Sequence, residues 1–125
     1  PLEINGPGSV FLFLKEKACN LDREHFWRID LDIRNRIIGY EVVSIGTLTA
    51  SLVHPREVFV GALLSKSAGV IIAHNHPSGE ITPSPEDKET TRRLVKAGEI
   101  LGVPVLDHLI VGDGKYFSFK ESGLL

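Results

Sequence analysis

The sequence is poor in several residue types, and each scarcity narrows what the protein can be. Its single cysteine, Cys19, cannot form a disulfide within the chain. No apolar run is long enough to cross a membrane, and no segment resembles a signal peptide. We therefore expect a cytoplasmic protein that has no membrane partner.

The chain also has little net charge and no methionine. Its 14 basic and 16 acidic residues give a formal net charge of -2, so no overall field attracts a nucleic-acid backbone, although a local basic patch stays open. A chain that begins at Pro1 and contains no methionine is expected to be a fragment. The region that we expect to precede it could carry a partner-binding module.

What the chain does have is the length and apolar content of one ordinary domain. Its 125 residues, 42% of them hydrophobic, suit a single core, so we predict one domain over residues 1–125. Ser9 is expected to cap a first helix that runs to about Leu21, because apolar residues are too dense there for a half-exposed strand. Cys19 would then be a small core residue of that helix.

Hydrophobic patterning further predicts a sheet with helices on its faces. Residues 26–31 alternate apolar and polar side chains, and residues 37–45 should pair with them antiparallel as a hairpin. The continuous apolar run 69–73 predicts a central strand covered on both sides. The remaining predicted elements are helices over 55–67 and 84–101 and strands over 103–111 and 116–119. The predicted class is therefore α/β, with a mixed sheet and flanking helices.

Two histidines and one aspartate form a candidate metal site. His74 and His76 stand at the end of the predicted central strand, where residues two apart project to the same side. Asp87 follows at the start of the next helix, beyond a loop long enough to fold back. Two imidazoles and one carboxylate leave a fourth tetrahedral position for water, as in catalytic zinc sites. Zinc lowers the pKa of such a water to about 7, which provides hydroxide at neutral pH.

Spacing alone leaves a plainer interpretation open. Ser84 is a good helix cap, Pro85 suits the first helical position, and acidic residues such as Asp87 favour the positive first turn. The pair His74 and His76 could likewise be a polar exit from the strand.

A family resemblance favours the metal site. The signature H-x-H-x7-S-x2-D of the JAMM metallohydrolases, also called MPN-plus or JAB, is matched in full by His74, His76, Ser84 and Asp87. From Glu24 onward the chain also resembles the narrower RadC family of bacterial proteins, through segments 54–57, 74–79, 83–84 and 107–112. The resemblance implies a cytidine-deaminase-like JAB/MPN fold that binds Zn²⁺ through the two histidines and Asp87.

The same resemblance implies roles for two further residues. Glu24 occupies the place of the family's glutamate that accepts a proton from the metal-bound water, so it is the candidate general base. Glu41, on the second strand of the hairpin, is the rival candidate. Ser84 is expected to donate a hydrogen bond to the carbonyl oxygen as negative charge develops on it, unless its hydroxyl serves only as a helix cap.

Four other polar residues are expected to stay outside the metal site. Asn75 should point to the face opposite the two histidines, and His25 should point away from the proposed base. His54 and His108 lie far along the chain from the histidine pair, and we expect them to be structural.

The implied activity is hydrolysis of a peptide or isopeptide bond in a protein or peptide substrate, with zinc as the cofactor. Two alternatives stay open: a metal-dependent nuclease, and a non-catalytic module of a DNA-repair or recombination complex, since RadC proteins have traditionally been labelled DNA-repair factors. Fold resemblance does not decide between them. The oligomeric state and the physiological substrate cannot be read from these residues.

Overall fold

A computed structural model of the chain describes residues 2–46 and 53–125. The predicted domain span 1–125 therefore includes residues 1 and 47–52, which lie outside the described part. The described elements are α1 (Pro7–Leu14), β1 (His25–Leu31), β2 (Ile37–Ile45), α2 (Pro55–Leu64), β3 (Gly69–Asn75), α3 (Pro85–Leu101), β4 (Val105–Val111) and β5 (Tyr116–Ser118). Within the described ranges, no helix is long and apolar enough to cross a membrane.

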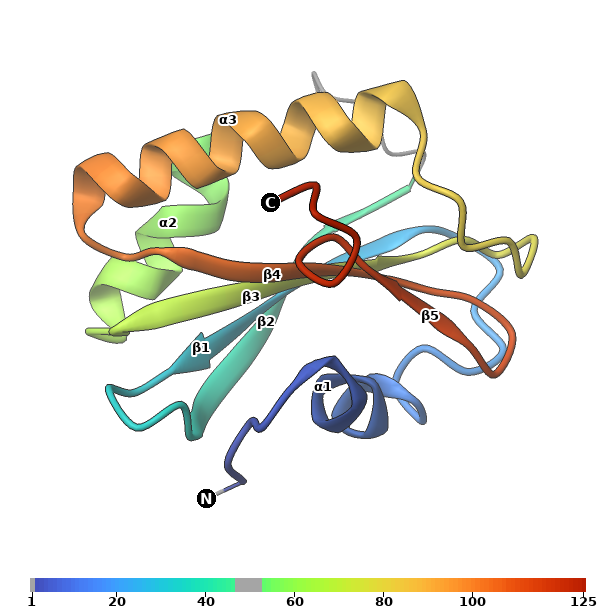
Figure 1. The fold of residues 1–125 in the computed structure, drawn as a ribbon, viewed down its shortest axis with the longest axis horizontal. Helices are drawn as coiled ribbons and strands as arrows, with labels where there is room; N and C mark the ends of the chain where they lie inside the picture. Colours follow the sequence, from blue (N-terminus) through green and yellow to red (C-terminus); the bar gives the residue numbers. More distant parts are fainter. Residues whose placement is uncertain (1, 47–52) are drawn as a thin grey trace.

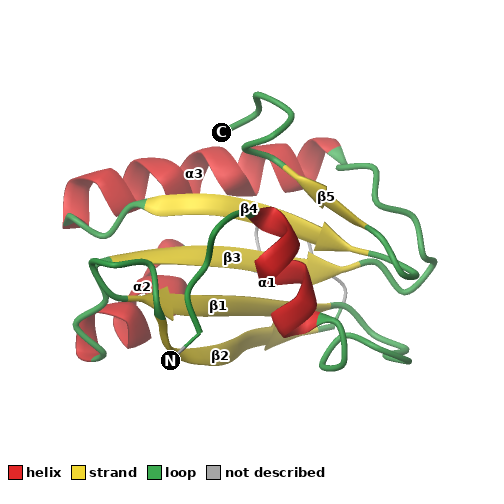
Figure 2. Ribbon diagram, turned by 60° about the horizontal axis from the view of Figure 1, so that its bottom comes forward, coloured by secondary structure: helices red, strands yellow, loops and turns green. Residues whose placement is uncertain are grey.

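The strands form a mixed sheet between two layers of helices, which confirms the predicted α/β class. In the described residues the strand order is β2-β1-β3-β4-β5. Helices α2 and α3 cover one face of the sheet, and α1 lies on the other (Figure 1). Figure 2 shows α1 in front of the sheet, crossing its strands.

Strand directions determine which strand termini meet at the end of the sheet where β3 finishes. β3 and β4 are parallel and are connected by α3, as a parallel pair requires. β1 runs antiparallel to β3, and β5 runs antiparallel to β4. The carboxyl ends of β3 and β4 therefore lie beside the first residues of β1 and β5, and Phe26 of β1 pairs with His74 of β3.

The sheet separates two apolar cores, and successive residues of each strand alternate between them. Phe26 and Ile72 pack with α2 and α3, whereas Trp27 and Ile71 pack with α1. β3 is buried along its whole length, as its continuous apolar run predicts for a strand covered on both faces. Because β3 lies in the middle of the sheet, its last residues, His74 and Asn75, lie between the ends of β1 and β4.

The first helix differs from its predicted boundaries at both ends. It begins at Pro7, whose ring presets the helical φ angle, so Gly6 occupies the N-cap and Ser9 is already inside the helix. The Ser9 hydroxyl donates to the Gly6 carbonyl at 2.8 Å. The helix ends at Leu14, and residues 15–20 form turns that end at Asn20 with φ 60. Cys19 lies in these turns and is exposed, so its prediction as a core residue was wrong.

Other boundaries shift by a few residues. α2 ends at Leu64, before Lys66 takes a φ of 55, rather than near residue 67. β3 extends to Asn75, and β4 begins at Val105 because Pro104 has no amide hydrogen to donate to a strand. β5 ends at Ser118, one residue earlier than predicted. None of these shifts moves an element to another layer.

Candidate metal centre

The two histidines of the predicted site meet where β3 ends. His74, fully buried, is the penultimate residue of β3, and His76 is the first residue after the strand. The amide of His76 donates to the Val111 carbonyl at 3.1 Å, which holds the chain alongside β4. The Nε2 atoms of the two rings are 3.1 Å apart. The Nε2 atoms of both imidazoles therefore face the same position, as the spacing of the two histidines on an extended chain predicts.

Asp87 reaches the same point from the first turn of α3. The Ser84 hydroxyl oxygen accepts a hydrogen bond from the Asp87 amide at 3.0 Å, and Asp87 Oδ2 accepts one from the Ser84 amide at 2.9 Å. This reciprocal capping box orients the carboxylate. Asp87 Oδ1 lies 3.2 Å from His74 Nε2, and Oδ2 lies 3.4 Å from His76 Nε2. The Asp87 side chain therefore both caps α3 and approaches the two histidines.

His74, His76 and Asp87 form a group that could hold a metal ion. Each offers one ligand atom, and these atoms all lie within 4.8 Å of one another. The Nδ1 atom of His76 lies 2.9 Å from the Glu80 carbonyl, which can only accept, so Nδ1 carries a proton and Nε2 is the nitrogen that faces the site. Imidazole nitrogen and carboxylate oxygen are donors suited to zinc and to other divalent transition metals.

The electrostatics of the group favour a cation. Burial opposes ionisation of Asp87, but hydrogen bonds from His74 and His76 outweigh it and hold the pKa of the carboxyl well below its ordinary value. The hydrogen bond to Asp87 raises the pKa of His76, and the charge of Glu24 adds to this effect. Asp87 is therefore a carboxylate at neutral pH, and Glu24 adds negative potential from the neighbouring strand.

Glu24, the candidate base, directly precedes β1 and is half-buried. The side chain of Asn75 holds the backbone on both sides of Glu24. Its Oδ1 accepts a hydrogen bond from the His25 amide at 2.6 Å, and its Nδ2 donates to the Arg23 carbonyl at 3.1 Å. The end of β3 is thereby fastened to the start of β1. Asn75 makes these bonds rather than facing Asp87, and no pattern in the sequence indicated that it would connect the two strands.

Glu41, the rival candidate, is committed to an ion pair. Its carboxylate accepts from Arg28 Nη1 at 2.6 Å, and 53% of its side chain is exposed. Arg28 is buried and also binds Asp30 at 2.8 Å and the Val58 carbonyl at 3.0 Å. Arg28 pairs with Ile72 in the sheet, two residues before His74. Glu41 is therefore the half-exposed end of a charge network that the buried Arg28 forms under α2.

This network predicts unequal effects for two similar substitutions. Asp30→Asn should lower the free energy of unfolding by about 3 kcal/mol, because it removes the buried partner of a buried guanidinium. Glu41→Gln should cost less than about 1 kcal/mol, because its carboxylate is half exposed to water. Urea denaturation of both variants checks the order. Equal losses would contradict the assignment of Asp30 as the main partner of Arg28.

The remaining histidines occupy different environments. His25 stacks on Trp27, with ring centroids 5.6 Å apart, and so faces the α1 side of the sheet. His54 occupies the N-cap of α2 without a side-chain capping bond. His108 is fully buried, and its Nε2 lies 2.8 Å from Nδ1 of His74. Burial, together with the nearby charge of His74, lowers the pKa of His108 well below its ordinary value. His108 therefore contacts the candidate ligand His74 at Nδ1, the ring nitrogen that faces away from the site.

A groove of about 400 Å³ leads from solvent to His76. Its walls are the turns after α1, the loop that follows β3, and the turn between β4 and β5. The loop after β3 and the turn between β4 and β5 pack backbone against backbone. A Cβ atom added to Gly112 would lie 2.3 Å from the Gly79 carbonyl oxygen, so only glycine allows this close approach. This groove opens the His76 end of the candidate site to solvent.

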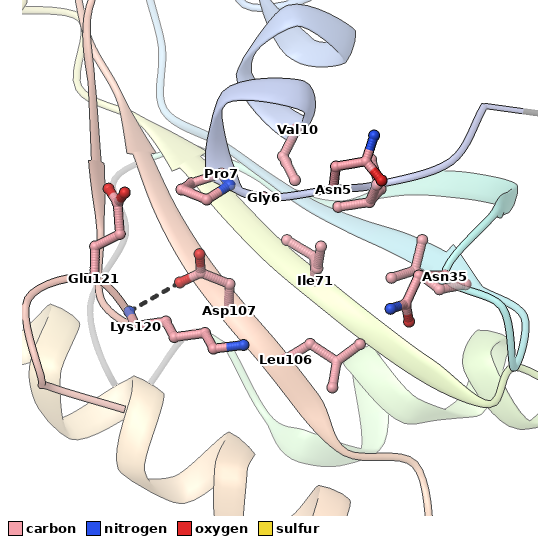
Figure 3. A pocket seen from close by; sticks show the side chains of 12 residues that line it. Asn5, Gly6, Pro7, Val10, Asn35, Ile71, Leu106, Asp107, Lys120 and Glu121 are labelled. Atoms are coloured by element: carbon pink, nitrogen blue, oxygen red, sulfur yellow. Dashed lines mark hydrogen bonds between the residues drawn. The ribbon is translucent and has the colours of Figure 1, made fainter.

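A second hollow, of about 470 Å³, lies on the α1 side of the sheet and does not include the candidate ligands (Figure 3). Asp107, the buried charged residue in its lining, accepts hydrogen bonds from the amides of His108 and Lys120 and from the hydroxyl of Ser118. Asp107 therefore anchors the segment after β5. Of the two hollows, only the smaller groove is lined by a candidate ligand, His76.

Known proteins resemble this chain along nearly its whole length. A family model described as RadC-like JAB domain matches residues 4–124. UPF0758 proteins of Symbiobacterium thermophilum, Rubrobacter xylanophilus and Methanococcoides burtonii are 55%, 52% and 50% identical to it. These alignments cover 99%, 98% and 98% of this chain but 53%, 53% and 54% of the three relatives. The chain thus spans about half the length of the curated relatives it matches.

Proposed function

Because the chain belongs to the family of RadC-like JAB domains, we propose that it is a zinc-dependent hydrolase that cleaves a peptide or isopeptide bond. The observation that carries the proposal is the convergence of His74 Nε2, His76 Nε2 and the Asp87 carboxylate on one point. Among the residues that the structure describes, three protein donors converge, and a catalytic zinc site keeps one position for water. The groove beside His76 supports access by an extended chain.

In this proposal His74, His76 and Asp87 hold the zinc ion, which when bound supplies a water of lowered pKa. Glu24 accepts the proton of the attacking water and returns it to the departing nitrogen. Ser84 uses its oxygen to accept from the Asp87 amide, and its O–H hydrogen remains able to donate to a substrate oxygen as that oxygen becomes negative. The capping role and the catalytic role of Ser84 are therefore compatible.

The test combines metal analysis with two substrate classes. Purified chain is loaded with zinc, and metal per chain is measured after dialysis. It is then incubated with a fluorogenic peptide library, with isopeptide-linked peptides, and with labelled single- and double-stranded DNA. We expect one zinc per chain and turnover of a peptide or isopeptide. DNA cleavage without peptide turnover would instead support a nuclease, and a chain that binds no zinc would support a non-catalytic module.

A further inference from the structure

We propose that Thr91 and His108 form a hydrogen-bond relay that keeps the proton of His74 on Nδ1, so that His74 presents the lone pair of Nε2 to the ion. The inference rests on the proposed function for the identity of the ion, but the relay is a property of the chain itself. It assigns two positioning residues, one from α3 and one from β4, behind a single ligand.

The direction of the relay is set at Thr91. Thr91 lies one turn after Asp87 on α3, and its side chain is buried. Its hydroxyl donates to the Asp87 carbonyl at 2.7 Å, and because a carbonyl can only accept, this bond uses the single hydroxyl hydrogen. Thr91 Oγ1 also lies 2.6 Å from His108 Nδ1. His108 must therefore donate from Nδ1 to Thr91.

His108 in turn determines which nitrogen of His74 carries a proton. His108 is 1% exposed, and its ring stacks on Phe119 with centroids 4.5 Å apart and planes 6° apart. A second proton would place an uncompensated charge in this apolar contact, so Nε2 of His108 remains an acceptor. His74 Nδ1, at 2.8 Å, then donates to it. The remaining nitrogen of His74, Nε2, faces Asp87 and His76, where a bound ion would take its lone pair.

The reverse direction fails at the first bond. It requires Thr91 to donate to His108, His108 to donate to His74, and His74 to keep its proton on Nε2. The Thr91 and Asp87 oxygens would then stand 2.7 Å apart with no hydrogen between them. Two acceptor oxygens at that distance repel each other, whereas the forward relay places one hydrogen in each of its three hydrogen bonds.

The matched pair Thr91→Val and Thr91→Ser tests the relay. Valine keeps the shape but removes the acceptor for His108 Nδ1, so His108 should shift its proton to Nε2 and force that of His74 onto Nε2. Serine keeps the hydroxyl. Long-range ¹H–¹⁵N spectra of metal-free chain at mildly alkaline pH report the tautomers, and zinc competition with a chromophoric chelator reports affinity. We expect about 10- to 100-fold weaker zinc binding in Thr91→Val and near wild-type binding in Thr91→Ser.

The outcomes separate the relay from the metal function. A His74 Nδ1 that carries no proton in the wild-type chain would overturn the relay, even if Thr91→Val does not fold. Unchanged tautomers and unchanged zinc affinity in a folded Thr91→Val would overturn it as well. If the wild-type chain shows the expected tautomers but binds no zinc, the relay stands and the zinc function fails.

Discussion

Asp87→Asn is expected to abolish stoichiometric zinc binding while leaving the fold intact. Asparagine keeps a carbonyl oxygen that can accept from the Ser84 amide, so the start of α3 retains its cap. It loses the negative charge that faces the two histidines at 3.2 and 3.4 Å. Residues that only orient a ligand cost about 10- to 100-fold in metal affinity, so loss of an anionic ligand should exceed about 100-fold.

Glu86→Gln is the matched control for this substitution. Glu86 lies in the same first turn of α3, is exposed, and loses the same charge near the helix N-terminus, which is worth about 0.3–1 kcal/mol. Zinc per chain is measured after dialysis, and thermal unfolding is followed by circular dichroism. Full zinc occupancy in a folded Asp87→Asn would remove Asp87 from the ligand set, and equal zinc loss in both variants would indicate a general charge effect.

The fold was readable wherever burial imposes a period on the chain. β3 is covered on both faces and so is apolar throughout, and the β1–β2 hairpin follows from two neighbouring strand patterns with a short connection. The first helix was harder to place, because its apolar residues continue through the turns that follow it. There, Pro7 and Asn20 set the boundaries through backbone angles rather than through hydrophobicity.

The candidate site was likewise predictable only in part. The spacing of His74 and His76 on a strand, with Asp87 at a helix start, was enough to predict that the three could meet. The residues behind them were not predictable, because their contacts depend on sheet register: β4 places His108 opposite Ile72, and only then can its ring reach His74. The segment around His108 contributed to the family resemblance, but that resemblance gave no role for it.

Asn75 shows why alternation along a strand is an incomplete guide. Its side chain was expected to point away from the two histidines and to have no metal role, and in the structure it binds the chain at Arg23 and His25. These two residues flank Glu24. The residue between the histidines therefore fixes the backbone of the candidate base relative to the candidate ligands. This fixed spacing is what makes substitution of Glu24 informative.

Glu24→Gln is expected to keep zinc and to lose hydrolysis. Glutamine has nearly the same size, and zinc affinity should stay near the wild-type value because Glu24 is outside the ligand group. It cannot accept the proton of the attacking water, so kcat on a cleaved peptide should fall by about 10²- to 10⁴-fold, the usual contribution of a general base. The negative potential that Glu24 adds at His76 would also be lost, which tunes the site without removing a ligand.

Glu41→Gln decides between the two glutamates under the same assay. Its carboxylate is held by Arg28 at 2.6 Å, so its loss should lower stability slightly and leave kcat unchanged. Measuring kcat, zinc per chain and unfolding for both variants separates catalysis from metal loss and from misfolding. Wild-type kcat in Glu24→Gln together with a large loss in a folded, zinc-loaded Glu41→Gln would transfer the base to Glu41. Equal losses in both would point to a change in the shared strand β1 rather than to one proton acceptor.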